Sequence, residues 1–195
     1  MAVDKRILFG SLGAAVIISI GGGWLVSRSG SAGPQEVTIT SAGTYPQTGI
    51  PTNAVVTGKT LPTVALTDFN GKSVSTASLL GKPLVINVWN TSCEPCQREL
   101  PAFAKVHSSL GDAVEFVGVN AGETASASTV KAFAKKYGVN YEDLTDPNGE
   151  LIVKLGISGF PYTLFVAANG TIVAQRGTEM TEADIRAAIS TKLLG

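Results

Sequence analysis

The feature that most constrains this chain is a short apolar segment, PLVINVW, which is followed within a few residues by two cysteines. Cys93 and Cys96 are the chain's only cysteines, and Pro95 stands between them. The segment before them is rich in β-branched residues, which is typical of a strand buried on both faces. A helix is expected to follow from Cys93. The pair therefore lies where a buried strand passes into a helix.

The position of the pair bears on its chemistry. Free backbone N–H groups and the positive end of the helix dipole stabilise a thiolate at a helix start. Residues i and i+3 on a helical turn are about 5–6 Å apart, within the span that a disulfide accepts. Cys93 and Cys96 can therefore join and separate with little backbone movement. An inert bridge is the alternative, but closing so short a loop removes little entropy from the unfolded chain. The context favours a redox-active pair.

Metal binding is a further alternative for the two thiols. Zinc takes four ligands, or three with a water molecule. The chain offers two thiols and a single histidine, His107, further along the sequence. Delivery of copper(I) by two soft thiolates stays open as the second hypothesis.

Apolar residues after the pair recur at steps of three and four, which predicts one buried helix face. These residues are Cys96, Leu100, Phe103, Val106 and Leu110. Glu99 borders this face. A carboxylate at the edge is expected to be partly desolvated, which would raise its pKa toward neutrality. A glutamate that reaches solvent is the alternative, and helical spacing alone leaves both open.

The N-terminal part of the chain predicts a membrane span. Residues 7–26 carry no charge, and Lys5 and Arg6 precede them. About 20 apolar residues suffice to cross the hydrocarbon core. The positive-inside rule then places residues 1–6 in the cytoplasm and the rest of the chain outside. A cleaved signal peptide is the alternative, and it would also export the remaining chain.

The rest of the chain divides into two parts. Residues 27–60 are rich in Ser, Thr, Gly and Pro without helical periodicity, which predicts a flexible stalk. In residues 61–195, strands alternate with helices, which predicts an α/β domain with a mixed sheet. Asn-Gly pairs at 70–71 and 169–170 predict two hairpins. The formal net charge is zero, so no basic surface argues for nucleic acid.

Three helices are predicted after the one that carries the cysteines. Apolar spacing from Val130 to Tyr137 indicates the first. The second is short and is opened by Asp146 and Pro147. Thr181 begins the third with a sequence that resembles a capping box.

Three segments resemble the thioredoxin superfamily, and most closely its membrane-anchored TlpA/ResA-type thiol–disulfide oxidoreductases. KPLVINVWNTSCEPCQRELPAF is similar to the strand, active site and helix of that family. GISGFPYTLFV is similar to the loop with the cis-proline, and DFNGKSVSTASLLGKP to the added N-terminal hairpin. The resemblance covers about residues 61–192. It implies a thioredoxin-like mixed sheet flanked by helices, and no cofactor besides the Cys93–Cys96 disulfide.

The resemblance also implies roles for single residues. Cys93 would be the exposed nucleophile, and Cys96 the buried resolving thiol. Glu99 matches a functional glutamate of ResA-like members, whereas Asn87 replaces the aspartate that thioredoxins proper keep beneath the pair. Pro161 matches the cis-proline. Contacts with the substrate are expected from Trp89, Glu94, Pro95, Phe160 and Pro161.

Ser92 and Tyr162 depart from the family pattern, in which tryptophan and threonine are common at these positions. Both line the expected substrate groove, so the client protein stays open.

The expected function is that of a thiol–disulfide oxidoreductase of the bacterial cell membrane, a single-pass protein whose C-terminal domain is extracytoplasmic. It would reduce client disulfides, with apocytochrome c or copper-site assembly proteins as the clients that the family implies. A membrane thiol carrier of the CcdA or DsbD type would supply electrons. The alternatives are an oxidant that forms disulfides and a copper(I)-binding chaperone. A peroxidase is less favoured, because it would not need Cys96 and Pro161 in these places.

Overall fold

The computed structural model describes residues 52–195. The membrane span predicted over residues 7–26 and most of the stalk predicted over residues 27–60 lie outside the described residues. Between residues 52 and 195, no helix combines the length and the apolar character that crossing a membrane requires.

Within the described residues, seven strands form one sheet in the order β2-β1-β5-β4-β3-β6-β7. Strands β3, β4 and β5 are parallel, and the other neighbours are antiparallel. The predicted mixed sheet and both predicted hairpins, β1–β2 and β6–β7, are confirmed. The strands are β1 (Ala65–Asp68), β2 (Ser73–Ser75), β3 (Leu84–Trp89), β4 (Glu115–Ala121), β5 (Glu142–Asp146), β6 (Tyr162–Val166) and β7 (Ile172–Arg176).

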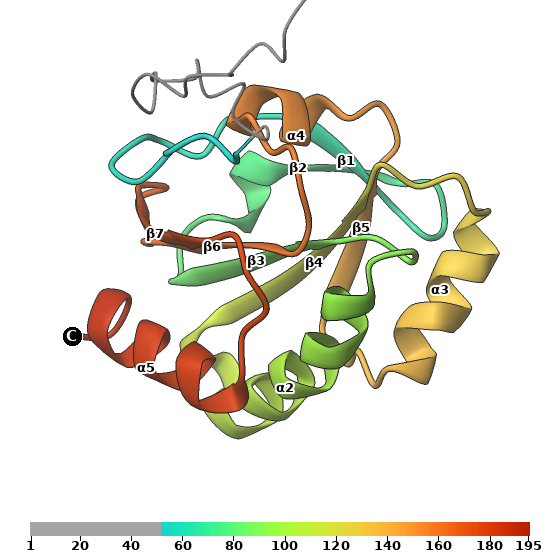
Figure 1. Ribbon diagram of the computed structural model, residues 1–195. Coiled ribbons are helices and arrows are strands. Elements are labelled where there is room, and N and C mark those ends of the chain that lie inside the picture. The colour runs from blue at the N-terminus through green and yellow to red at the C-terminus, as the bar shows by residue number, and fades with distance from the viewer. Residues whose placement is uncertain (1–51) are drawn as a thin grey trace, which may run out of the picture. The chain divides into compact units, whose positions relative to one another are not determined.

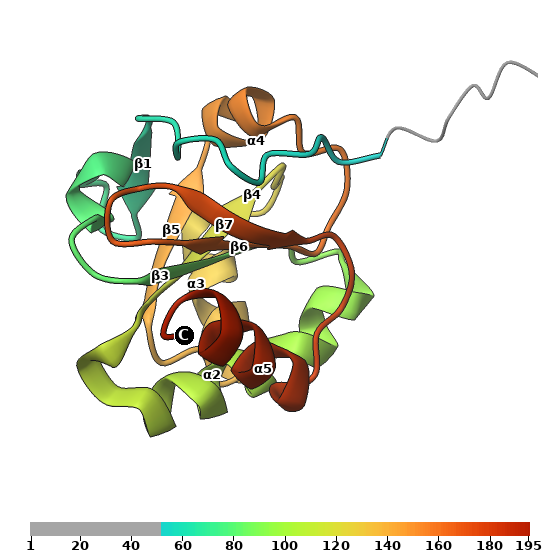
Figure 2. The same ribbon diagram turned by 90° about the vertical axis from the view of Figure 1, so that its left-hand side faces the viewer.

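The helices cover both faces of the sheet. Helices α2, α3 and α5 lie on one side and α4 lies on the other, as Figure 1 and Figure 2 show. The α-helices are α2 (Glu94–Leu110), α3 (Ala127–Lys136), α4 (Glu150–Leu155) and α5 (Glu182–Lys192). Two short 3-10 turns, Thr76–Leu79 and Gly111–Ala113, complete the described elements.

The helix starts agree with the capping signals in the sequence. Thr181 and Asp184 form the predicted capping box of α5, with aspartate in place of the usual glutamate. Asp146 ends β5, and its carboxylate accepts the backbone N–H groups of Glu150 and Leu151 at 2.9 and 3.0 Å. The helix that was expected to open at Asp146 therefore begins at Glu150, with Asp146 as its acceptor.

Strand β5 is absent from the strands that the sequence predicts. Its sequence, EDLTD, holds three carboxylates, and acidic residues are depleted in isolated strands. In the fold it pairs in parallel with β4 and antiparallel with β1. Its strand structure therefore depends on partners that are distant in the sequence.

The centre of the sheet positions the cysteines. Every residue of β3 is buried, as predicted for the segment before the pair. β3 lies between β4 and β6, and its carboxyl end leads directly to Cys93. The carboxyl ends of parallel strands are where open α/β sheets bind their ligands.

The folded domain begins before Leu61, which corrects the predicted boundary of the stalk. The N–H of Ala54 donates to the carbonyl of Gly156 at 2.9 Å, and Oδ1 of Asn53 accepts the N–H of Ser158 at 2.7 Å. Val56 is buried in the main core. Residues 53–60 thus pack on the domain, although their composition is that of a linker, because their backbone groups find partners far along the chain.

Candidate active site

Cys93 and Cys96 form a disulfide at the start of α2, with an S–S distance of 2.06 Å and a Cα–Cα distance of 5.3 Å. Cys93 is half-buried and Cys96 is fully buried. The backbone N–H of Cys96 donates to Sγ of Cys93 at 3.2 Å. This donor, together with the helix dipole, would stabilise a thiolate at Cys93. The predicted geometry of the pair is confirmed.

The loop between β3 and the disulfide is held by polar side chains. Nδ2 of Asn90 donates to the carbonyls of Ala121 and Gly122, both at 2.9 Å, which ties this loop to the end of β4. Oδ1 of Asn90 accepts the N–H of Ser92 at 2.9 Å. No local pattern in the sequence points to Asn90, because the carbonyls that it binds lie at the end of another strand.

Glu123 supports the same loop from the segment after β4. Its Oε2 accepts the N–H of Thr91 at 3.0 Å, and its Oε1 accepts the N–H of Ala125 at 3.0 Å. Burial alone would raise the pKa of Glu123, but these donors and the side chain of Asn120 lower it to about 2. Glu123 therefore stays ionised at physiological pH.

Glu99 lies one helical turn after Cys96, with only 1% of its surface exposed. Nδ2 of Asn87 donates to Oε1 at 2.7 Å, and the N–H of Met180 donates to Oε2 at 3.0 Å. Burial raises the pKa of Glu99 to about 7, against the lowering effect of these two donors. The expected desolvation is confirmed, and the outward-facing alternative is excluded. The role of Asn87 as the partner of this carboxyl is a finding of the structure.

The segment before β6 completes the site. The Phe160–Pro161 peptide bond is cis, as the resemblance implies. Phe160 and Cys93 both pack, partly exposed, against the apolar cluster that contains Cys96. A Cβ built at Gly122 would lie 3.5 Å from the Phe160 ring. The loops after β3, β4 and α4 therefore meet around the disulfide.

Trp89 does not fit the substrate-contact role expected from the resemblance, and that prediction is wrong. Its side chain is fully buried and stacks on Phe133 of α3, with ring centroids 5.7 Å apart. Its Nε1 donates to Oδ1 of Asp143 at 3.1 Å. The reason is that Trp89 still belongs to the covered part of β3. Of the other expected contacts, Glu94 is exposed, Pro95 and Phe160 are half-buried and Pro161 is buried.

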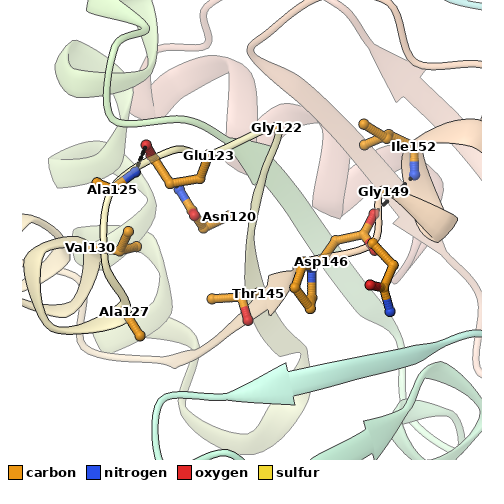
Figure 3. A pocket seen from close by; sticks show the side chains of 12 residues that line it. Asn120, Gly122, Glu123, Ala125, Ala127, Val130, Thr145, Asp146, Gly149 and Ile152 are labelled. Atoms are coloured by element: carbon orange, nitrogen blue, oxygen red, sulfur yellow. Dashed lines mark hydrogen bonds between the residues drawn. The ribbon is translucent and has the colours of Figure 1, made fainter.

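A pocket of about 420 Å³ opens at the carboxyl ends of β4 and β5, beside the active-site loop. Its lining includes Glu123 and Asp146, which Figure 3 shows turned toward the backbone N–H groups of Ala125 and Ile152. Both carboxylates thus accept hydrogen bonds from backbone N–H groups, Glu123 in the active-site loop and Asp146 at the start of α4. Neither cysteine lines this pocket.

The part of the chain that the structure describes shows no group of three or more His, Cys, Asp or Glu side chains able to hold a metal ion. His107 lies near the far end of α2, where its ring packs edge-on against Phe116 and Tyr141 at 5.5 and 5.7 Å. The single histidine is therefore engaged in an aromatic cluster.

A Cys-Glu-Pro-Cys disulfide at the start of a helix, together with a cis-proline just before β6 of a mixed sheet, is the arrangement of a thioredoxin-like thiol–disulfide oxidoreductase. Comparison with known proteins agrees. Residues 57–175 match the model of the AhpC/TSA family, and the chain belongs to this family.

Individual relatives point to the same activity. The chain is 35% identical over 129 residues to the thiol-disulfide oxidoreductase ResA of Bacillus subtilis (strain 168), which covers 66% of this chain and 71% of ResA. A secreted Mycobacterium tuberculosis disulfide oxidoreductase homologous to E. coli DsbE aligns with a TM-score of 0.59 and 26% identity, over 66% of this chain and 95% of that one. A DsbF homologue from Corynebacterium diphtheriae aligns with a TM-score of 0.61 and 27% identity, over 68% and 86%.

Proposed function

We propose that this oxidoreductase is tethered to the bacterial cell membrane and reduces disulfides in extracytoplasmic client proteins. The observation that carries the proposal is the pairing of an accessible Cys93 with a buried Cys96 and a buried Glu99 one helical turn further on. A partly exposed thiol can attack a client, and a buried thiol with its own proton acceptor can release it.

The first step is attack by the Cys93 thiolate on a client disulfide. The N–H of Cys96 points at Sγ of Cys93, which favours the thiolate at this position. The attack forms a mixed disulfide between Cys93 and the client, and the second client sulfur leaves as a thiolate. Glu94 and Pro95 follow Cys93 in the chain, and Phe160 packs against the same apolar cluster as Cys93. These residues and the cis-proline Pro161 would contact the extended client segment.

The second step releases the client. Burial raises the pKa of a thiol, so Cys96 needs an acceptor for its proton. Asn87 cannot accept a proton, whereas Glu99 has a pKa of about 7 because of its burial. Glu99 would take the proton as general base, and the Cys96 thiolate would then attack Cys93 and restore the disulfide.

The tether and the partners follow from the sequence and the family resemblance. The uncharged run over residues 7–26 would anchor the chain and place the domain outside the membrane. A reductant in an oxidising compartment needs electrons from across the membrane, which a thiol carrier of the CcdA or DsbD type would supply. Apocytochrome c or copper-site assembly proteins would be the clients.

The reduction potential of the Cys93–Cys96 pair tests the direction of the reaction. We expect a value near that of thioredoxin, about −270 mV, for a reductant. A value near that of DsbA, about −120 mV, would contradict the proposal and favour the oxidant.

Trapping in the native cells tests the roles of the cysteines and identifies the clients. A full-length Cys96→Ala chain should accumulate mixed disulfides, because the resolving thiol is missing. The matched Cys93→Ala chain should accumulate few, because its remaining thiol is buried. Equal trapping by both variants would contradict the assignment.

A further inference from the structure

Three buried polar atoms in residues 52–195 have no hydrogen-bond partner in the protein: Oδ1 of Asn87, the hydroxyl of Tyr141 and Oδ2 of Asp143. The sheet register sets Asn87 opposite Gly118, and Gly118 opposite Asp143. Tyr141 directly precedes β5, and its ring lies 6.0 Å from that of Phe116, which is on the same face of β4 as Gly118. Buried polar groups normally have a partner, ordered water included. Three such atoms on one face of neighbouring strands indicate a shared polar site.

Gly118 makes this site possible. A Cβ at this position would overlap Oδ1 of Asp143. Because glycine has no side chain, the carboxyl group of Asp143 can lie over β4, toward β3. There its Oδ1 accepts Nε1 of Trp89 at 3.1 Å, and its Oδ2 is left for another partner.

Glu99 reaches the same site from α2. Its Oε1 accepts a hydrogen bond from Nδ2 of Asn87. Oδ1 of the same asparagine is one of the three unpartnered atoms. Burial raises the pKa of Tyr141 well above its usual value, and the charges of Asp143 and Glu99 raise it further. The Tyr141 hydroxyl is therefore within electrostatic reach of both carboxyl groups, and a hydroxyl can donate and accept at once.

The other end of the site opens to the surface. Asp143 and Tyr141 line a pocket of about 240 Å³, together with the exposed Lys131 and Lys135 of α3. The titratable groups that line this pocket with Asp143 are Tyr141, which directly precedes β5, and these two lysines of α3. Glu99 approaches the site from α2 through its hydrogen bond with Asn87. A proton on Asp143 has a short way to solvent.

We propose that Asp143 is a second proton-holding residue of the active site, exchanging protons with Glu99 by way of the Tyr141 hydroxyl and with solvent through the pocket beside α3. It acts through Glu99 and is a positioning residue for the reaction. The inference rests on the proposed role of Glu99 as the base. Burial raises the pKa of Asp143 to about 7, the same range as that of Glu99, so both carboxyl groups can exchange protons near neutral pH.

In the resolving step, protons and electron pairs move in the following order. Cys96 gives its proton to Glu99, and its thiolate attacks Sγ of Cys93. The bond between Cys93 and the client breaks, and the client sulfur leaves with the electron pair as a thiolate. The proton on Glu99 moves to Asp143 and then to solvent, which returns Glu99 to its basic form. Electrons pass only between sulfurs.

The test measures resolution in the full chain, using thionitrobenzoate attached to Cys93 and following its release as a function of pH. Asp143→Asn keeps the size and the acceptor for Trp89. We expect release to slow roughly ten-fold near pH 7, less than loss of a direct base would cost. Glu142→Gln, the adjacent exposed carboxylate on β5, should release at the normal rate.

Three outcomes separate this inference from the proposed function. If Asp143→Asn slows release and adds nothing to Glu99→Gln, the two residues act in one route. If Asp143→Asn releases normally while Glu99→Gln is slow, the role of Asp143 is wrong and that of Glu99 stands. If both release normally, the proposed base is wrong and this inference fails with it.

A second measurement needs no substitution at Asp143. Carbon-13 NMR of side-chain carboxyls can follow the titration of Asp143 in the native chain and in Glu99→Gln. A coupled pair should give a changed Asp143 curve when Glu99 is replaced. Identical curves in the two chains would overturn the proposal.

Discussion

Glu99 and Glu123 both lie near the Cys93–Cys96 disulfide, yet their environments shift their pKa values in opposite directions. Glu99 is almost fully buried and has two donors, so desolvation dominates and its pKa rises to about 7. Glu123 is less buried and accepts from Thr91, Ala125 and Asn120, so its donors dominate and its pKa falls to about 2. The same residue type can thus exchange a proton near neutral pH in one place and stay a fixed anion that holds the loop in the other.

The largest expected effect is on the rate of disulfide exchange, when the carboxyl of Glu99 is removed. Glu99→Gln keeps the shape of the side chain but removes the proposed proton acceptor of Cys96. We expect disulfide exchange near pH 7 to slow on the order of 10²–10⁴-fold, with little change in fold. Stopped-flow exchange and the pH titration of cysteine alkylation measure this. Glu150→Gln is a control for the loss of a half-buried carboxylate on α4, which lies on the other side of the sheet from α2. An unchanged rate and titration in Glu99→Gln would make Glu99 a structural acid only.

The next effect concerns stability against pH. Glu99 has a folded pKa of about 7 against its usual 4.5, so the folded state binds more protons between these values. Its contribution to stability is complete below about pH 4.5 and is lost as the pH rises through 7, on the order of 3 kcal/mol. Denaturant unfolding of the native chain and of Glu99→Gln at pH 5 and pH 8 tests this. The variant should lose less stability over this interval, and equal losses would contradict the raised pKa.

A glycine substitution sharpens the comparison for the second buried carboxyl. Gly118→Ala would force the carboxyl of Asp143 away from Trp89, and we expect a loss of about 1–3 kcal/mol in unfolding free energy. Replacing Asp143 by alanine in the same chain should recover part of that loss, because the overlap is removed. Denaturant unfolding of the single and double variants decides, and strictly additive losses would show that the two positions do not compete for space.

The smallest expected effect concerns Glu123, whose carboxylate holds the loop at Thr91. Glu123→Gln leaves one acceptor oxygen for several donors, and the lowered pKa of Glu123 means that its contribution is present above about pH 4.5 and lost toward pH 2. Because solvent screens a partly exposed carboxylate, we expect the unfolding free energy of Glu123→Gln to fall by only about 1 kcal/mol at pH 7. Hydrogen exchange of the Thr91 amide should also become faster in this variant, because its acceptor is weakened. A native exchange rate at Thr91 would show that the loop is held by Asn90 alone.

Local patterns in the sequence predict much of the fold. The Asn-Gly turns, the buried β3 segment, the capping residue Thr181 and the apolar face of α2 each depend on residues within a few positions of one another. Such signals survive without knowledge of the rest of the chain. The packed residues 53–60 and strand β5 lack them, because their partners lie on distant segments.

For the site, the sequence by itself determined the Cys93–Cys96 pair at a helix start and the place of Glu99 at the edge of a buried face, since both follow from helical spacing. Only the tertiary structure decided that Asn87 and Met180 hold Glu99, that Glu123 braces Thr91, and that Trp89 is buried. Hydrogen bonds between strands and desolvation depend on which segments the sheet brings together. The acid strengths on which the chemistry rests are therefore properties of the packed domain.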